Sequence, residues 1–202
     1  MAALLCADPG QAGADIVHHY VYRVVHATYG DIGTYTNTVD TAGDVTTVKT
    51  TSHFVVKMLG ITIHTEDAQR TERWKDNRLV FFHGVTDKNG KPTEIKGEAR
   101  GDSFVISTPA GVFVAPATVH PANPLGSASL KTNAMMHVDT GKVEPVKVSG
   151  GGQTTIELDG KTITAREYQV GTRYRVWIDE HDVPVKFIVN DDSGQVTFLL
   201  QR

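Results

Sequence analysis

The chain has 202 residues, a formal net charge of −3, a pI near 6.3 and a single cysteine. This length supports one domain whose core needs no metal or disulfide to stabilise it, and one cysteine excludes an internal disulfide. The mild negative charge argues against nucleic-acid binding, which favours a pI above about 9, and no apolar run reaches the roughly 18 residues of a transmembrane helix.

The first fourteen residues, MAALLCADPGQAGA, are typical of the end of a secretory leader. Ala12-Gly13-Ala14 fits the small-x-small pattern before a cleavage point, and residues 2–6 resemble the tail of an apolar signal core. We interpret residues 1–14 as a remnant signal peptide, with a disordered tail as the alternative, and residues 15–202 as a single β domain. The protein is therefore expected to be periplasmic or secreted.

The rest of the chain alternates between β-like runs and turns. Val and Thr together supply about a quarter of the residues, and both favour strands. Short turns between neighbouring runs predict antiparallel hairpins in a meander. The predicted strands are 15–29, 32–40, 44–57, 61–75, 78–86, 92–100, 103–108, 111–115, 142–149, 153–158, 161–170, 173–179, 183–190 and 195–201.

Residues 116–138 interrupt the strand pattern. Their prolines favour extended or turned backbone, and Ser127 or Ser129 is a candidate cap for a short helix carrying Leu130, Ala134 and Val138. The sequence therefore predicts an all-β fold, a strongly curved antiparallel sheet in the form of a half-barrel or open barrel meander. Residues 116–138 are expected to form a helical or loop plug in its concave face, or alternatively a surface crossover that closes the sheet.

The nine histidines raise the question of a metal site. A two-residue turn at Leu59-Gly60 predicts that His53 pairs with Glu66, which places both on one face together with His64. Two histidines and a carboxylate form a known iron-binding set, but Lys57 on the same face would repel a cation. We therefore predict no metal and no cofactor.

Catalytic motifs are equally sparse. The chain has no Gly-x-Ser-x-Gly elbow, and Gly150-Gly151-Gly152 lacks the Lys-Ser/Thr pair of a phosphate loop, so it is interpreted as a hairpin loop. No catalytic residue is assigned. An isomerase or cyclase that uses His64 or His83 inside the barrel is the least favoured alternative.

The two tryptophans occupy similar contexts near strand ends. Trp74 lies in Glu72-Arg73-Trp74-Lys75-Asp76, and strand alternation places Trp177 on the same face as Arg173 and Arg175, so that an arginine is expected to stack on the indole. We interpret them as the rim of a ligand pocket, with simple cover for strand ends as the alternative.

The C-terminal part of the chain carries a family resemblance. The segments Val176-Trp177-Ile178-Asp179-Glu180, 183–187 and 192–198 are similar to the ending of periplasmic lipoprotein carriers. Over residues 15–202 the pattern resembles a bacterial family of exported β-rich proteins of unknown function, in the segments 30–33, 54–61, 72–76, 86–91, 115–117 and 139–142. The resemblance implies an open, curved sheet around a plug, and in the carriers the concave surface receives acyl chains. Long first hairpins and a Pro-rich insert distinguish this chain from the carriers.

These observations predict an exported binding protein that holds a lipid or another apolar or amphipathic small molecule in the concave face of the sheet. The alternative is an envelope structural or interaction protein, without a ligand, that pairs with a partner protein through an exposed strand edge. The expected ligand-binding residues are Phe54, Val56, Ile63, Trp74, Phe81, Phe113, Met135, Met136 and Trp177.

Overall fold

The computed structural model describes residues 16–191 and 193–201, and the predicted signal peptide lies outside them. The described residues are almost entirely β, and they contain no helix with the length and apolarity needed to cross a bilayer. The strands are β1 (Ile16–His26), β2 (Gly30–Ala42), β3 (Val45–Met58), β4 (Ile61–Lys75), β5 (Arg78–Lys88), β6 (Lys91–Arg100), β7 (Ser103–Thr108), β8 (Gly111–Pro116), β9 (Val119–Pro121), β10 (Ala134–Met136), β11 (Val143–Pro145), β12 (Val148–Leu158), β13 (Lys161–Val170), β14 (Tyr174–Ile178), β15 (Pro184–Asp191) and β16 (Gly194–Leu200).

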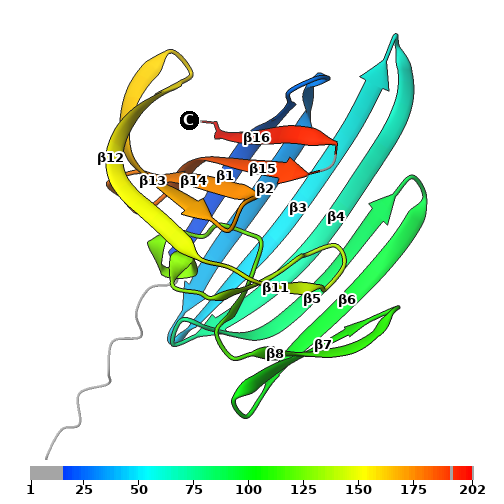
Figure 1. Cartoon of the computed structure of the whole chain (residues 1–202), viewed down its shortest axis with the longest axis vertical. Helices are drawn as coiled ribbons and strands as arrows, with labels where there is room; N and C mark the ends of the chain where they lie inside the picture. Colours follow the sequence, from blue (N-terminus) through cyan, green and yellow to red (C-terminus); the bar gives the residue numbers. More distant parts are fainter. Residues whose placement is uncertain (1–15, 192, 202) are drawn as a thin grey trace, which may run out of the picture.

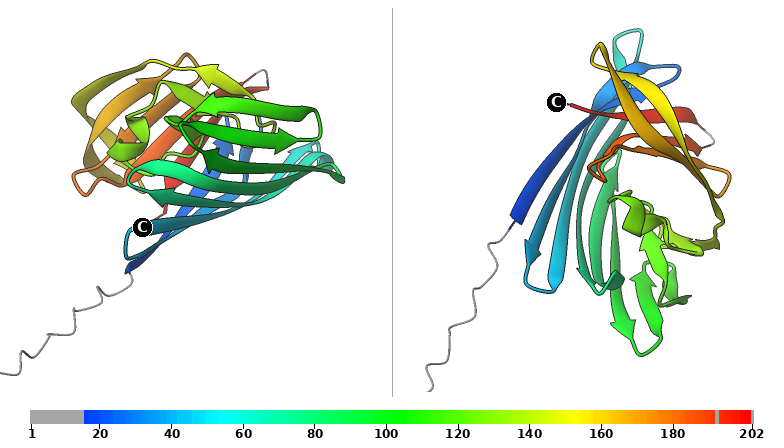
Figure 2. Two further views of the ribbon diagram at one scale, coloured as in Figure 1. Left: turned by 90° about the horizontal axis from the view of Figure 1, so that it is seen from below. Right: turned by 90° about the vertical axis from the view of Figure 1, so that its left-hand side faces the viewer.

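Thirteen of these strands form one antiparallel sheet. Its order is β12-β13-β14-β15-β16-β1-β2-β3-β4-β5-β6-β7-β8, so two meanders are joined where β16 pairs with β1. The sheet curves strongly but its end strands, β12 and β8, do not pair, which leaves the barrel open (Figures 1 and 2). This confirms the predicted fold class.

Two local predictions are corrected. Gly150-Gly151-Gly152 does not form a hairpin loop but lies within β12, at a bulge opposite β13. The expected helix after residue 127 is a single 3-10 turn, η1 (Ser127–Leu130), with Gly126 rather than a serine at its N-cap. The Thr132 hydroxyl lies within hydrogen-bonding distance of the Thr118 and Ala134 carbonyl oxygens and accepts from the Ala134 N–H. These local bonds compete with the backbone bonds that would continue the helix.

The segment between β8 and β12, residues 117–147, crosses the concave side of the sheet (Figure 2). It contains η1 and a three-stranded sheet in which β10 lies between β9 and β11. Lys88 of β5 anchors its far end, because its Nζ lies 2.6 Å from Asp139 Oδ2 and 3.5 Å from Glu66 Oε2. We call residues 117–147 the plug.

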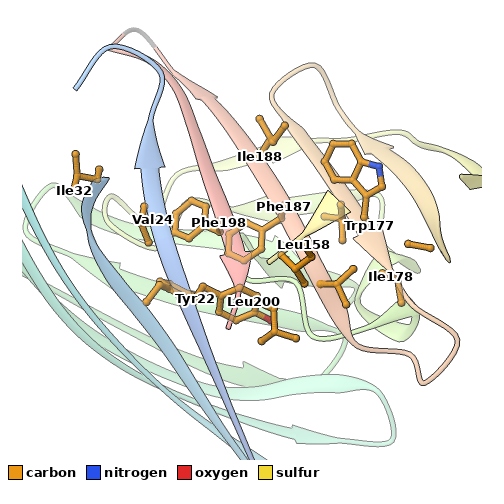
Figure 3. Packing of buried hydrophobic residues seen from close by; sticks show 14 of the residues in the cluster. Tyr22, Val24, Ile32, Leu158, Trp177, Ile178, Phe187, Ile188, Phe198 and Leu200 are labelled. Carbon is orange, nitrogen blue, oxygen red and sulfur yellow. The ribbon is translucent and has the colours of Figure 1, made fainter. Parts of the chain in front are cut away.

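The core has two parts. In the first, Tyr22, Tyr35, Phe187 and Phe198 pack ring to ring on β1, β2, β15 and β16, and the Phe187 and Phe198 rings stack with centroids 4.1 Å apart (Figure 3). In the second, apolar plug residues pack against the buried side chains of β3–β8. This second group consists of Val48, Trp74, Leu79, Phe82, Ile95, Phe104, Ile106, Ala115, Val119, Ala134 and Met136. The plug therefore fills the concave face with side chains.

Candidate functional site

A buried polar cluster joins the plug to the sheet. Asn123 follows β9, and its Oδ1 accepts hydrogen bonds from Tyr35 Oη at 2.8 Å and Asn37 Nδ2 at 3.0 Å. Its Nδ2 donates to Glu72 Oε1 at 3.0 Å and to Thr50 Oγ1 at 3.3 Å. Thr50 Oγ1 in turn donates to Asn37 Oδ1 at 2.7 Å, so the amide of Asn123 uses its full hydrogen-bonding capacity.

Glu72 is the buried ionisable group of this cluster. Its side chain is fully buried, and burial raises the pKa of its carboxyl to about 7, against the lowering effect of hydrogen bonds from Asn123 and Trp74 and of the Arg70 charge. Trp74 Nε1 donates to Glu72 Oε2 at 3.0 Å. The pKa of the Glu72 carboxyl therefore lies near neutral pH although the side chain is shielded from bulk water.

His120 lies beside the cluster in strand β9 and stacks at a tilt on Trp74, with ring centroids 4.6 Å apart. Its side chain is buried, its Nδ1 has no hydrogen-bond partner among the described residues, and burial lowers its pKa to about 4. A cavity of about 190 Å³ opens next to these two rings. Its lining is Val39, Thr46, Val48, Trp74, Asn77, His120, Leu125, Ala128 and Ser129.

The nine predicted ligand-binding residues do not converge on one cavity. Trp74 lines the cavity just described, whereas Met135 and Met136 belong to the plug itself and are buried. Phe54 and Val56 pack with the first part of the core.

The other four lie elsewhere. Phe81 faces away from the plug, under the Arg73 guanidinium, and lines a hollow of about 440 Å³ on that outer face. Ile63 and Phe113 are exposed at the sheet's periphery. Trp177 is buried with Arg175 and Lys186 each 4.7 Å from its ring centroid, which confirms the predicted arginine stack and identifies the arginine as Arg175.

The predicted histidine pairing is wrong by one residue. Met58 pairs with Ile61 as expected, but Ile63 is an extra residue in β4, so that Val56 pairs with His64 and Phe54 with Glu66. His53 therefore points to the opposite face, where its Nδ1 lies 2.7 Å from Asp67 Oδ1. Among the described residues, no three His, Cys, Asp or Glu side chains are placed to hold a metal ion.

The two free edges of the sheet differ in character. On β8 the exposed fractions are 67% for Val112, 40% for Phe113 and 70% for Val114, and the strand carries no charged residue. On β12 the residues are mostly polar or glycine, and the bulge at Gly150 interrupts the edge. Bulges and polar residues are devices that protect an edge from pairing, and β8 lacks both.

Sequence reasoning missed Glu72, Asn123 and His120, and it did not single out β8. One signal was present for Glu72, because alternation along β4 places it on the same face as Ala68 and Trp74. Asn123 and His120 lie in the irregular plug, where no periodicity indicates which side chains are buried.

Comparisons with known proteins agree with this architecture. A family model described as "Domain of unknown function (DUF6134)" matches residues 22–201, which confirms the predicted membership of a β-rich family of unknown function. The chain is also similar to the crystal structure of a beta-barrel-like protein of domain of unknown function DUF1849 from Brucella abortus. The TM-score is 0.65 at 10% identity, covering 93% of this chain and 96% of that chain, so the likeness concerns the fold alone. No curated protein sequence matches.

Proposed function

The chain belongs to the DUF6134 family of domains of unknown function, and we propose that it is an exported binding protein whose partner is another protein. The partner supplies an extended apolar segment that adds to the sheet at β8. The single observation that carries this proposal is the uncharged edge of β8, with Val112, Phe113 and Val114 exposed.

The chemistry of β8 specifies the kind of partner. A terminal strand presents backbone N–H and C=O groups at regular intervals, and only another extended strand matches that spacing. Val114 and Val112 lie on one face with Val105 and Ser107, while Phe113 lies on the other face with Ile106. A partner strand with apolar residues on both faces would therefore cover this edge.

Export is part of the same proposal and is supported by the leader-like sequence that ends in Ala12-Gly13-Ala14. A protein that works in the envelope or outside the cell would meet its partner there.

Photo-crosslinking in the host tests the proposal. A photoreactive phenylalanine analogue at Val114 is expected to trap one discrete partner, whereas the same group at Thr155, exposed on the opposite edge strand β12, is the matched control. The substitution Val112→Lys should reduce the yield of the adduct formed at Val114 at least about tenfold, because a lysine disfavours strand addition at an edge. Equal adducts from both edges, or an adduct between two copies of this chain, would contradict the proposal.

The cavity beside Trp74 and His120 supports a second candidate function, the binding of an apolar small molecule. At about 190 Å³ it is smaller than the roughly 300–1,000 Å³ of sites for drug-sized ligands, so it suits a compact molecule, and a lipid with long acyl chains would have to displace the plug. Native mass spectrometry of protein purified from its own envelope should show a discrete, solvent-extractable adduct. A bare mass, repeated after incubation with host lipid extract, would exclude the carrier function.

A further inference from the structure

The β3–β4 hairpin projects beyond its neighbours in the sheet. Strand β2 pairs with β3 only as far as Phe54, and β5 pairs with β4 only as far as Glu66. Residues 55–65 therefore form strand pairs only with one another, as a two-stranded finger that extends past the rest of the sheet (Figures 1 and 2).

The end of this finger is apolar and exposed. The exposed fraction is 97% for Leu59, 68% for Ile61, 53% for Met58 and 43% for Ile63. The finger carries no acidic side chain, and its one lysine, Lys57, is exposed just behind the apolar end. This arrangement places an uncharged tip in front of a cation.

The turn at the tip uses a residue that turn chemistry disfavours. Leu59 has φ +52°, in the left-handed region where Asn, Asp and Gly are preferred. The equivalent positions in other hairpins of this sheet are occupied by Asp76, Asn89 and Asp159. A leucine in this conformation stabilises neither the turn nor the core. We therefore attribute its presence to an interaction that its exposed side chain makes with another molecule or surface.

We propose that the finger inserts its tip into the surface of a lipid bilayer. With about 3.4 Å per residue, Leu59 extends about 7 Å beyond Lys57, which matches the ~5–10 Å depth of segments that lie in the bilayer interface. Lys57 then lies at the level of the headgroups, where anionic phosphates attract it.

Two features favour a bilayer over a protein pocket. The end of the finger is convex and mostly apolar, and Thr62 and Lys57 are its exposed polar side chains, which is little to orient a specific protein partner. Its outer backbone edges have no strand partner, so deep insertion into hydrocarbon would leave N–H and C=O groups unsatisfied, and only the hydrated interface accommodates them. This inference does not depend on pairing at β8.

Vesicle flotation of the full chain tests the inference, with phosphatidylcholine vesicles with and without phosphatidylglycerol. The wild type is expected to float with the vesicles, more strongly when phosphatidylglycerol is present. Leu59→Asn should lower the partition coefficient at least about tenfold, because it removes a side chain whose burial drives insertion. Its Tm should stay equal or rise, because Asn adopts a positive φ more readily than Leu.

The control variant is Val17→Asn, which removes an exposed apolar side chain from β1 at the opposite end of the sheet from the finger and should leave flotation unchanged. Ile61→Thr provides a second test, because it keeps a β-branched residue in the strand and is also expected to weaken flotation. The inference is overturned if the wild type stays with neither kind of vesicle, or if Leu59→Asn and Ile61→Thr float as the wild type does.

Discussion

Replacing Asn123 by alanine is expected to lower the free energy of unfolding by about 4 kcal/mol. The Asn123 amide accepts from Tyr35 and Asn37 and donates to Thr50 and Glu72, all in the buried cluster. Alanine would remove the amide partner of these four groups, and burial makes such unpaired polar groups costly. The loss of a hydrogen bond to the buried Glu72 carboxyl contributes most, because charged groups are the most costly to leave unpaired.

Urea unfolding at neutral pH, followed by the fluorescence of Trp74 and Trp177, measures the effect. Asn133→Ala is the matched control, because Asn133 is exposed and its Oδ1 accepts a hydrogen bond from the Thr118 hydroxyl at 2.8 Å. The control should lose less than about 1 kcal/mol. If the two variants lost the same stability, the cluster around Asn123 would not be what holds the plug.

This cluster also explains why the concave face differs from that of an open carrier. Asn123 ties the plug to β2, β3 and β4, and Met136 and Val119 of the plug pack against Phe82 and its neighbours. The space that the sequence interpretation assigned to an acyl chain is therefore occupied largely by the chain's own side chains. The exposed edge at β8 is therefore a better candidate for a binding surface than the concave face of the sheet.

The sheet was predictable because alternation and turn chemistry are local. Each hairpin carries its own signal, such as Asn89-Gly90 or Asp159-Gly160, and neighbouring strands need only pair in sequence. Register was less predictable, because the extra residue at Ile63 changes which histidine faces inward and leaves no trace in the pattern of residue types.

The site was harder to predict because it depends on contacts between distant segments. A glutamate normally indicates a solvated position, and Glu72 is buried here with a hydrogen bond from Asn123, which lies 51 residues away in the sequence. Likewise, Val112-Phe113-Val114-Ala115 has the composition of a core strand. Its first three residues are exposed on an edge strand because no further strand follows β8 in the sheet, and that is a property of the whole topology.

The pH dependence of stability is expected to distinguish the contribution of Glu72 to the free energy of unfolding from that of His120. Burial raises the Glu72 pKa from 4.5 to about 7. Between these pH values the folded state binds more protons at Glu72 than the unfolded state does. The stability that this protonation contributes is therefore lost as the pH rises from 4.5 to 7. Burial lowers the His120 pKa from 6.5 to about 4, so its contribution is present above pH 6.5 and is lost as the pH falls to 4. Each contribution amounts to about 3 kcal/mol, and in the wild type the two largely cancel between pH 4.5 and 6.5.

Single variants reveal the two contributions. Relative to the wild type, Glu72→Gln should gain about 3 kcal/mol of stability between pH 4.5 and 7, because the wild type alone must ionise a buried carboxyl over that range. His120→Asn should gain a similar amount relative to the wild type as the pH falls from 6.5 to 4. Urea unfolding across this pH range measures both differences. Curves that run parallel to the wild type would show that Glu72 and His120 each have the same pKa in the folded and unfolded states, and the cluster would then act only by holding the plug against the sheet.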